Sequence, residues 1–152
     1  PTKPSVLLLH EDDLSPGWLI DLGLQPLETA TLDATGQISP LHVAPQVTAF
    51  KSALMADCTA RWSASFGRVT NGLRSAQQIE DWARAAGAEQ IVTPYAPVGP
   101  AATILNDIRA LPLVRPLRDF DRRAWPHATA GFFKFKKKIP ELVGAMKGLQ
   151  AV

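Results

Sequence analysis

The feature that most constrains the fold is a short run of consecutive apolar residues near the N-terminus. Residues 5–10 read Ser-Val-Leu-Leu-Leu-His, and the acidic residues Glu11, Asp12 and Asp13 follow directly. A strand with one solvated face alternates apolar and polar side chains, whereas a strand inside a parallel sheet is apolar on both faces. The run therefore predicts a central strand of a parallel sheet.

Helical and strand patterns alternate after this run. We expect a second, more exposed strand over residues 27–32. Between Pro45 and Gly67, apolar residues recur every three or four positions and predict one long helix with a single apolar stripe. The residues of this stripe are Val47, Phe50, Leu54, Cys58, Trp62 and Phe66. Since Cys58 is the only cysteine and lies on the stripe, we expect it to pack in the core.

The next helix has clear start and stop signals. Ser75 and Gln78 have the spacing of a capping box, and Gly87 supplies the stop. The expected buried face consists of Ile79, Trp82, Ala83 and Ala86. Strands are expected at residues 90–93 and 113–117, with a helix between them.

That helix is expected over residues 101–111, burying Ile104, Leu105, Ile108 and Leu111. Strands and helices that alternate with short connections form right-handed βαβ units, which make the strands parallel and place helices on both faces. The sequence therefore predicts an α/β fold with a doubly wound, mainly parallel sheet of the Rossmann-like type.

The whole chain of 152 residues is expected to form one such domain. Within it, residues 1–4 are interpreted as a linker and residues 118–152 as a basic aromatic segment that covers the domain or docks on another one. No apolar run approaches the length needed to cross a bilayer, so we expect no membrane partner. No secretory signal pattern is present, which makes a cytoplasmic location the expectation.

In open parallel sheets, ligands bind beyond the carboxyl ends of the strands. The loops that begin at His10, Thr70 and Thr93 are therefore the places to search. Among their residues, His10, Asp13, Thr93 and Tyr95 are the candidate ligand contacts. The loop over residues 93–100 holds three prolines and the only tyrosine of the chain, and it is either a stiff connection or a ligand contact.

Several kinds of catalytic site are not expected. His42 and His127 are distant in sequence from His10, so no metal site is predicted. The glycine-rich loops that cradle phosphates and the Gly-x-Ser-x-Gly turn of hydrolases do not occur. We therefore expect no catalytic residues and no enzyme activity from this chain alone.

The C-terminal part of the chain is basic. Residues 1–108 hold 6 basic and 11 acidic side chains, whereas residues 109–152 hold 10 and 3. The segment over residues 122–140 interleaves cations with aromatic rings, a pattern that suits either single-stranded nucleic acid or a protein interface. Because no stacking sheet or helix-turn-helix accompanies it, we favour docking on another domain. The predicted docking residues are Trp125, Phe132, Phe133, Lys134 and Phe135.

Several segments of the chain, taken in order, resemble a known family. They are Ile91-Val92-Thr93-Pro94-Tyr95-Ala96-Pro97, the helix to Leu111, Leu113-Val114-Arg115-Pro116 and Gly131-Phe132-Phe133-Lys134-Phe135. Their order and spacing resemble the α/β antenna domain of the photolyase/cryptochrome family, mainly over residues 75–140. The opening strand with Asp13 and Leu14 is similar too, but the family has arginines around that pair where this chain has His10, Glu11 and Asp12.

The resemblance implies a non-catalytic accessory or antenna domain cut from a larger DNA photolyase-like flavoprotein. Its implied cofactor is a folate or flavin chromophore, and its implied partner is an FAD-binding helical domain of the same parent chain, on either side of it in sequence. Repair of pyrimidine dimers in DNA would belong to that parent alone. Two alternatives stay open: a small nucleotide-binding α/β protein of the universal-stress kind, and a nucleic-acid-binding module that uses the basic aromatic tail.

Overall fold

The structure is a computed structural model that describes residues 3–146. It divides into two compact units, residues 1–116 and residues 117–152. We describe each unit by itself. The boundary falls next to the start of the basic aromatic segment at residue 118.

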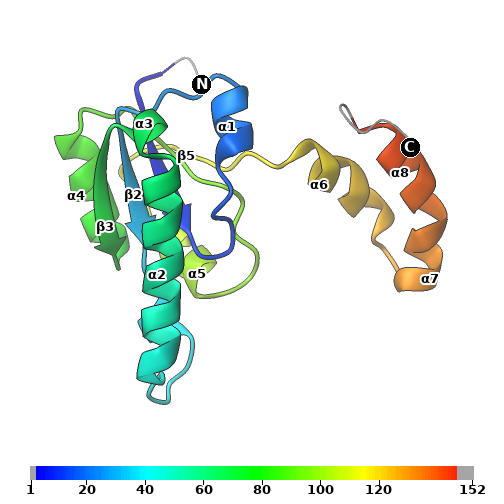
Figure 1. The fold of residues 1–152 in the computed structure, drawn as a ribbon, viewed down its shortest axis with the longest axis horizontal. Coiled ribbons are helices and arrows are strands. Elements are labelled where there is room, and N and C mark those ends of the chain that lie inside the picture. The colour runs from blue at the N-terminus through cyan, green and yellow to red at the C-terminus, as the bar shows by residue number, and fades with distance from the viewer. Residues whose placement is uncertain (1–2, 147–152) are drawn as a thin grey trace. The chain divides into compact units, whose positions relative to one another are not determined.

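The first unit is built on one five-stranded sheet with the order β3-β2-β1-β4-β5 (Figure 1). The strands are β1 (Ser5–His10), β2 (Glu28–Leu32), β3 (Arg68–Leu73), β4 (Gln90–Val92) and β5 (Leu113–Val114). Every neighbouring pair of strands is parallel. The predicted α/β class with a parallel sheet is therefore confirmed.

Strand β1 lies in the middle of this sheet, as the apolar run predicts. Leu7 pairs with Thr29 of β2 on one side and with Val92 of β4 on the other. Val6 and Leu8 belong to the core on one face of the sheet, and Leu7 and Leu9 belong to the core on the opposite face. Because helices bury both faces of this strand, polar and apolar residues do not alternate along it, and residues 6–9 are all apolar.

Helices cover both faces. They are α1 (Gly17–Asp21), α2 (Pro45–Arg61), α3 (Ser63–Phe66), α4 (Ala76–Ala85) and α5 (Pro100–Asn106), with a 3₁₀ turn η1 (Thr35–Gln37) after β2. Residues of α4 and α5 share one core cluster with the sheet, and residues of α1, α2 and α3 share the other. The sheet is thus doubly wound, as expected.

Strand β2 differs from the expectation of a more exposed strand. Its residues from Thr29 to Leu32 are all buried, because β3 pairs along its outer side. The Thr29 hydroxyl donates to the carbonyl of Phe66 at 3.0 Å, and the Thr31 hydroxyl donates to Asn71 Oδ1 at 3.3 Å. The polar residues of β2 are buried with hydrogen-bond partners, which the sequence pattern alone does not reveal.

The long helix expected between Pro45 and Gly67 is also different. It ends at Arg61, and Trp62 separates it from the short helix α3. Cys58 and Phe66 are fully buried, as the stripe predicts, but three stripe residues nearer the helix start are exposed. Their exposed fractions are 40% for Val47, 64% for Phe50 and 40% for Leu54.

The exposure of Val47, Phe50 and Leu54 has a geometric reason. A helix of 17 residues is about 25 Å long, whereas a strand of five or six residues spans about 17–20 Å. Figure 1 shows the first half of α2 extending past the carboxyl ends of the strands. The sheet therefore has no surface under that half of the stripe.

Helix α4 carries the predicted start and stop. The Ser75 hydroxyl accepts a hydrogen bond from the N–H of Gln78 at 3.3 Å. The Gln78 side chain reaches the N–H of Arg74 at 2.7 Å, one residue earlier than a capping box requires. Gly87 follows the helix with φ +73°, which favours glycine.

Helix α5 is shorter than the expected span over residues 101–111, because it ends at Asn106. Ile104, Leu105 and Ile108 are buried as predicted, while Leu111 is only partly buried. Strand β5 is likewise limited to two residues of the expected five. Residues 107–112 form an irregular connection between the two elements.

The second unit consists of short helical segments. They are α6 (Asp119–Ala124), η2 (Trp125–His127), α7 (Phe132–Phe135), η3 (Lys136–Lys138) and α8 (Ile139–Gly144). Ala124 of α6 and Leu142 of α8 are its buried apolar residues. Across residues 3–146, no helix combines the length and the hydropathy that a membrane crossing requires.

Candidate ligand site at the carboxyl edge of the sheet

His10 ends strand β1 and joins it to the loop after β4. The side chain is fully buried, and Nε2 lies 3.0 Å from the carbonyl oxygen of Pro94. Since a carbonyl only accepts, Nε2 must carry the proton and donate. Nδ1 lies 3.6 Å from a carboxylate oxygen of Asp12. His10 therefore holds the loop of the predicted ligand contacts against the central strand.

The other predicted ligand contacts lie at the same edge. Asp13 closes a turn, in which its N–H donates to the His10 carbonyl at 3.1 Å and its carboxylate accepts from the N–H of Ser15 at 3.0 Å. Thr93 is fully buried and its N–H donates to the carbonyl of Val114 at 3.0 Å. Tyr95 is 39% exposed. The structure thus places these four residues around one end of the β1–β4 pair. His10 Nε2 and Asp13 form hydrogen bonds within the fold, whereas His10 Nδ1 and the Thr93 hydroxyl are buried without a hydrogen-bond partner among the described residues.

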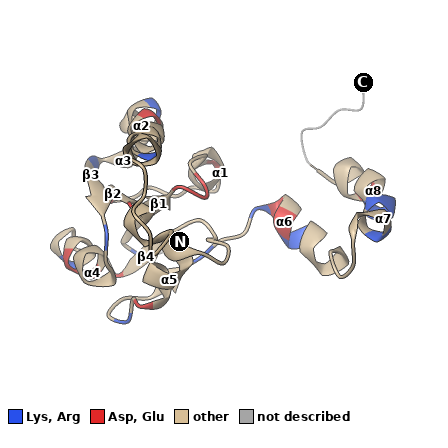
Figure 2. Cartoon of the chain, turned by 90° about the horizontal axis from the view of Figure 1, so that it is seen from below, with Lys and Arg blue, Asp and Glu red and all other residues tan. Residues whose placement is uncertain are grey.

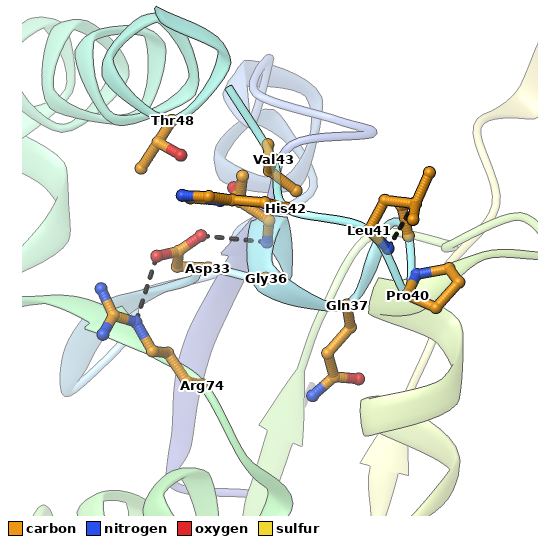
Figure 3. Close-up of a pocket in the computed structure, with 11 residues that line it drawn as sticks. Asp33, Gly36, Gln37, Pro40, Leu41, His42, Val43, Thr48 and Arg74 are labelled. Carbon is orange, nitrogen blue, oxygen red and sulfur yellow. Dashed lines mark hydrogen bonds and ion pairs between the residues drawn. The ribbon is translucent and has the colours of Figure 1, made fainter. Parts of the chain in front are cut away.

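A cavity of about 550 Å³ opens at the neighbouring carboxyl ends of β2 and β3 (Figure 3). Its lining comes from the loop after β2, from the first turn of α2 and from the residue that follows β3. The lining residues are Asp33, Thr35, Gly36, Gln37, Ser39, Pro40, Leu41, His42, Val43, Thr48 and Arg74. Cavities that bind small molecules usually measure about 300–1,000 Å³, so this one has the size for such a ligand.

One ion pair dominates the polar side of the cavity. Arg74 Nε donates to Asp33 Oδ2 at 3.2 Å, and Asp33 Oδ1 accepts from the N–H of Thr35 at 3.1 Å. Burial of Asp33 raises its pKa, but the hydrogen bonds from Thr35 and the Arg74 guanidinium outweigh this and hold the pKa below its usual range. Asp33 is therefore a carboxylate at neutral pH.

The two partners of this pair differ in exposure. The Asp33 side chain is 12% exposed, whereas the Arg74 side chain is 72% exposed. Figure 3 shows the Arg74 guanidinium meeting Asp33 with one nitrogen, while His42 and Thr48 lie on the other side of the carboxylate. Arg74 thus keeps N–H donors available to an anionic ligand group.

A second cavity of about 210 Å³ lies between α2 and strands β2 and β3. It is lined by Thr31, Asp33, Ser52, Met55, Ala56, Asn71, Gly72 and Arg74. Asp33 and Arg74 line both cavities, so the ion pair is shared by the two hollows. Both cavities therefore lie at the sheet edge formed by β2 and β3.

The sequence interpretation did not include Asp33, His42 or Arg74 in the site. Two signals were available: parallel strands bring their following residues to one edge, and both Asp33 and Arg74 directly follow strands. The placing of strand-end residues at one edge could be used to find Arg74 only if β3 was predicted as a strand. Its sequence Arg-Val-Thr-Asn-Gly-Leu is polar and contains glycine, so it gave no clear strand signal. The prediction of a loop that begins at Thr70 was wrong, because Thr70 lies inside β3 and pairs with Ala30 of β2.

The predicted docking residues lie in the second unit. The exposed fractions are 46% for Trp125, 64% for Phe132 and 76% for Phe133, and Lys134 is also exposed. Phe135 is half-buried. The aromatic residues are thus displayed on the surface of this unit.

Other reactive groups are dispersed or buried. Within residues 3–146, no three side chains of His, Cys, Asp or Glu lie close enough together to hold a metal ion. Cys58 is fully buried with its Sγ 3.3 Å from the Leu14 carbonyl, and burial raises the pKa of its thiol. Among the described residues of the first unit, the Asp33–Arg74 cavity therefore remains as a candidate site.

No model of a known protein family matches this sequence, and no curated protein matches it. The photolyase resemblance described from the sequence therefore stays a prediction.

Proposed function

We propose that this chain is the non-catalytic α/β domain of a photolyase-like flavoprotein and that it binds a heteroaromatic chromophore, a folate or a flavin, in the Asp33–Arg74 cavity. The observation that carries the proposal is this cavity, where a carboxylate and a largely exposed guanidinium lie at the carboxyl edge of a doubly wound sheet. When bound, such a chromophore absorbs light and passes the excitation on.

The chemistry of the cavity suits such a ligand. Folates and flavins carry ring N–H groups that donate hydrogen bonds to a carboxylate. Asp33 is charged, and one of its carboxylate oxygens is held in place by the hydrogen bond from the Thr35 N–H. Both ligand classes also carry an acidic tail, a carboxylate or a phosphate, which Arg74 can bind through N–H groups. Because Asp33 and Arg74 lie 3.2 Å apart, one bound ligand would use either its ring or its tail at this pair. Leu41 and Val43 supply apolar contact for the ring faces.

The proposal gives this chain no catalytic step. FAD and the repair of damaged DNA would belong to a helical domain of the same parent chain, and a cytoplasmic location follows from that role. Trp125 and Phe135 are the residues we propose for docking on that domain, because interface cores favour aromatic side chains. A light-driven reaction would thus require the parent protein.

The test is a titration of the full chain with FMN and with folic acid, followed by ligand fluorescence anisotropy. The decisive variant is Arg74→Ala, which removes the exposed guanidinium. The matched control is Arg61→Ala, which removes an exposed arginine paired with Asp57 at the other end of α2. A hydrogen bond to a charged group contributes about 1.5–3 kcal/mol, so Arg74→Ala should weaken binding about tenfold or more.

The control variant should bind as the unsubstituted chain does. Equal binding by Arg74→Ala and Arg61→Ala would contradict the assignment of the cavity. Absence of binding for both FMN and folic acid would contradict the chromophore role of this chain.

A nucleotide is a second candidate, and one observation favours it. Sheets with this strand order bind dinucleotides at their carboxyl edge, where an acidic residue accepts hydrogen bonds from the ribose. Asp33 directly follows β2 in the β3-β2-β1-β4-β5 order. The glycine-rich phosphate loop that accompanies such sites does not follow β1. A nucleoside held by Asp33 is therefore compatible, and a bound pyrophosphate is less so.

Thermal shift with ATP, AMP and NAD separates the two candidates. A ligand at about 100 times its Kd adds about 2.7 kcal/mol to stability. Stabilisation by AMP and not by FMN or folic acid would favour the nucleotide. The reverse pattern would favour the chromophore.

A further inference from the structure

We propose that the second unit binds single-stranded nucleic acid through a surface made by Phe132, Phe133, Lys134, Lys136 and Lys137, here called the Phe/Lys surface. This inference is independent of the cavity in the first unit. It rests on how the rings and the lysines are displayed.

The two phenylalanines present their rings to solvent. Phe132 is 64% exposed and Phe133 is 76% exposed. Their ring centroids lie 5.8 Å apart with an angle of 66° between the ring planes, an edge-to-face arrangement. Two adjacent exposed rings on α7 thus offer aromatic faces and edges to a ligand.

The lysines around these rings differ from three other cations among the described residues of the unit. Arg122 and Arg123 both pair with Asp119, and Lys138 pairs with Glu141. Within the described part of the chain, Lys134, Lys136 and Lys137 form no ion pair. Residues 131–140 hold four lysines and no acidic residue. Figure 2 shows Lys and Arg colour at α7, whereas α6 carries both charge colours.

One lysine already lies on a ring. The Nζ atom of Lys136 is 5.0 Å from the centroid of the Phe133 ring, within the range of a cation–π contact. Such a contact at an exposed site is weak, about 0.5–1 kcal/mol. A nucleobase can therefore replace the ammonium on the ring face, and Lys136 can then meet a phosphate.

Single-stranded nucleic acid fits this surface better than a duplex does. Unstacked bases offer faces to aromatic rings, and their backbone offers phosphates to lysines at the same time. In a duplex the base faces are covered by their neighbours. Helix α7 has four residues and makes a poor reader of a major groove, which admits a longer helix.

The proposal assigns a nucleic acid to Phe132, Phe133 and Lys134, which the sequence analysis gave to domain docking. Trp125 and Phe135 keep the docking role. The two assignments are separable, because Phe135 is half-buried and the rings of Phe132 and Phe133 are exposed.

The test uses the full chain and a fluorescent oligo-dT longer than the roughly 4–16 nucleotides of a typical single-strand site. Binding is measured by anisotropy over a series of salt concentrations, next to a duplex of equal length. Single strands give a slope of about −0.7 in log K against log salt for each neutralised phosphate, so three lysines predict about −2. Lys137→Ala should reduce the slope by about 0.7, whereas Arg61→Ala, outside the surface, should leave it unchanged.

A second variant tests stacking apart from charge. The double variant Phe132→Leu/Phe133→Leu keeps apolar side chains but removes both rings, and it should weaken oligo-dT binding about fivefold or more. Vesicles of phosphatidylserine serve as the comparison for an anionic membrane surface. The proposal would be overturned if the unsubstituted chain did not bind oligo-dT while the double variant bound the vesicles as tightly as the unsubstituted chain does. Equal affinity for duplex and single strand, or a slope that Lys137→Ala does not change, would overturn it too.

Discussion

Replacing Gly67 by alanine tests the backbone between helix α3 and strand β3. Gly67 has φ +63° and ψ −145°, a region that is nearly restricted to glycine. A Cβ atom at this position would lie 2.8 Å from the carbonyl oxygen of Leu27, which belongs to the chain leading into β2. The substitution thus combines backbone strain with an overlap against another backbone segment.

The magnitude follows from these two effects. A residue held in such a region costs about 1–3 kcal/mol, and an added methyl group in a packed site costs about 1–3 kcal/mol. Alanine also reduces the entropy of the unfolded chain, which returns about 0.4–1 kcal/mol. Gly67→Ala should therefore lower the free energy of unfolding by about 1–6 kcal/mol.

Gly87→Ala is the matched control. Gly87 also has a positive φ, +73°, but a Cβ there would meet no atom within 4 Å. The left-handed conformation alone costs about 1–2 kcal/mol, less the same entropic gain, so the net loss should be about 1 kcal/mol or less.

The assay is urea unfolding followed by tryptophan fluorescence, since three of the four tryptophans, Trp18, Trp62 and Trp82, lie in the first unit. With a slope of about 1–3 kcal/mol per M urea, each kcal/mol of lost stability lowers the midpoint by about 0.3–1 M, so Gly67→Ala should lower the midpoint clearly further than Gly87→Ala does. Equal midpoints for the two variants would refute the reasoning about Leu27.

Three further predictions concern buried and anchored groups of the first unit. Glu80 Oε1 accepts hydrogen bonds from the N–H groups of Arg109 and Ala110 at 2.6 and 2.7 Å, and these bonds hold the pKa of Glu80 below its usual range. The stability that Glu80 contributes is therefore present above the usual pKa of a glutamate and is lost as the pH falls through the lowered pKa. The difference in Tm between the unsubstituted chain and Glu80→Ala should shrink in acid, and a pH-independent difference would refute this. The Cys58 thiol should react with a thiol reagent at pH 8 only after unfolding, because it is buried and its pKa is raised; rapid reaction of the native chain would contradict its packing. Trp82→Phe removes the hydrogen bond that Trp82 Nε1 donates to Glu28 at 3.1 Å, and it should lower the free energy of unfolding in urea by about 1.5 kcal/mol. An unchanged urea midpoint would refute the role of that hydrogen bond.

The parts of the fold that the sequence predicts are those with strong local signals. The apolar run ending at His10 indicates a strand buried on both faces, and β1 is the middle strand. Ser75 and Gly87 mark the ends of α4, where the side-chain cap and the positive φ are both present. In these cases the residue types themselves require the local structure.

Features that depend on neighbouring elements were predicted less well. Periodicity identifies the stripe of α2, but it does not reveal that the strands are shorter than the helix and leave Phe50 uncovered. The burial of Thr31 depends on β3, a strand whose polar sequence gave no strand signal.

The cavity has the same origin. Asp33 and Arg74 are 41 positions apart and meet because the two strands before them are paired. A site that forms where two paired strands end can be predicted only when both strands are predicted. Because β3 was not predicted, the predicted site was placed at the neighbouring β1–β4 edge.

The most direct test of the central claim is a map of backbone amide chemical shifts in the full chain during titration with FMN and with folic acid. The account predicts that the largest changes occur at residues 33–43, Thr48 and Arg74, around the cavity. Changes centred on His10, Asp13, Thr93 and Tyr95 would instead place the ligand at the β1–β4 edge and contradict the assignment. An unchanged spectrum with both ligands would contradict the binding function itself.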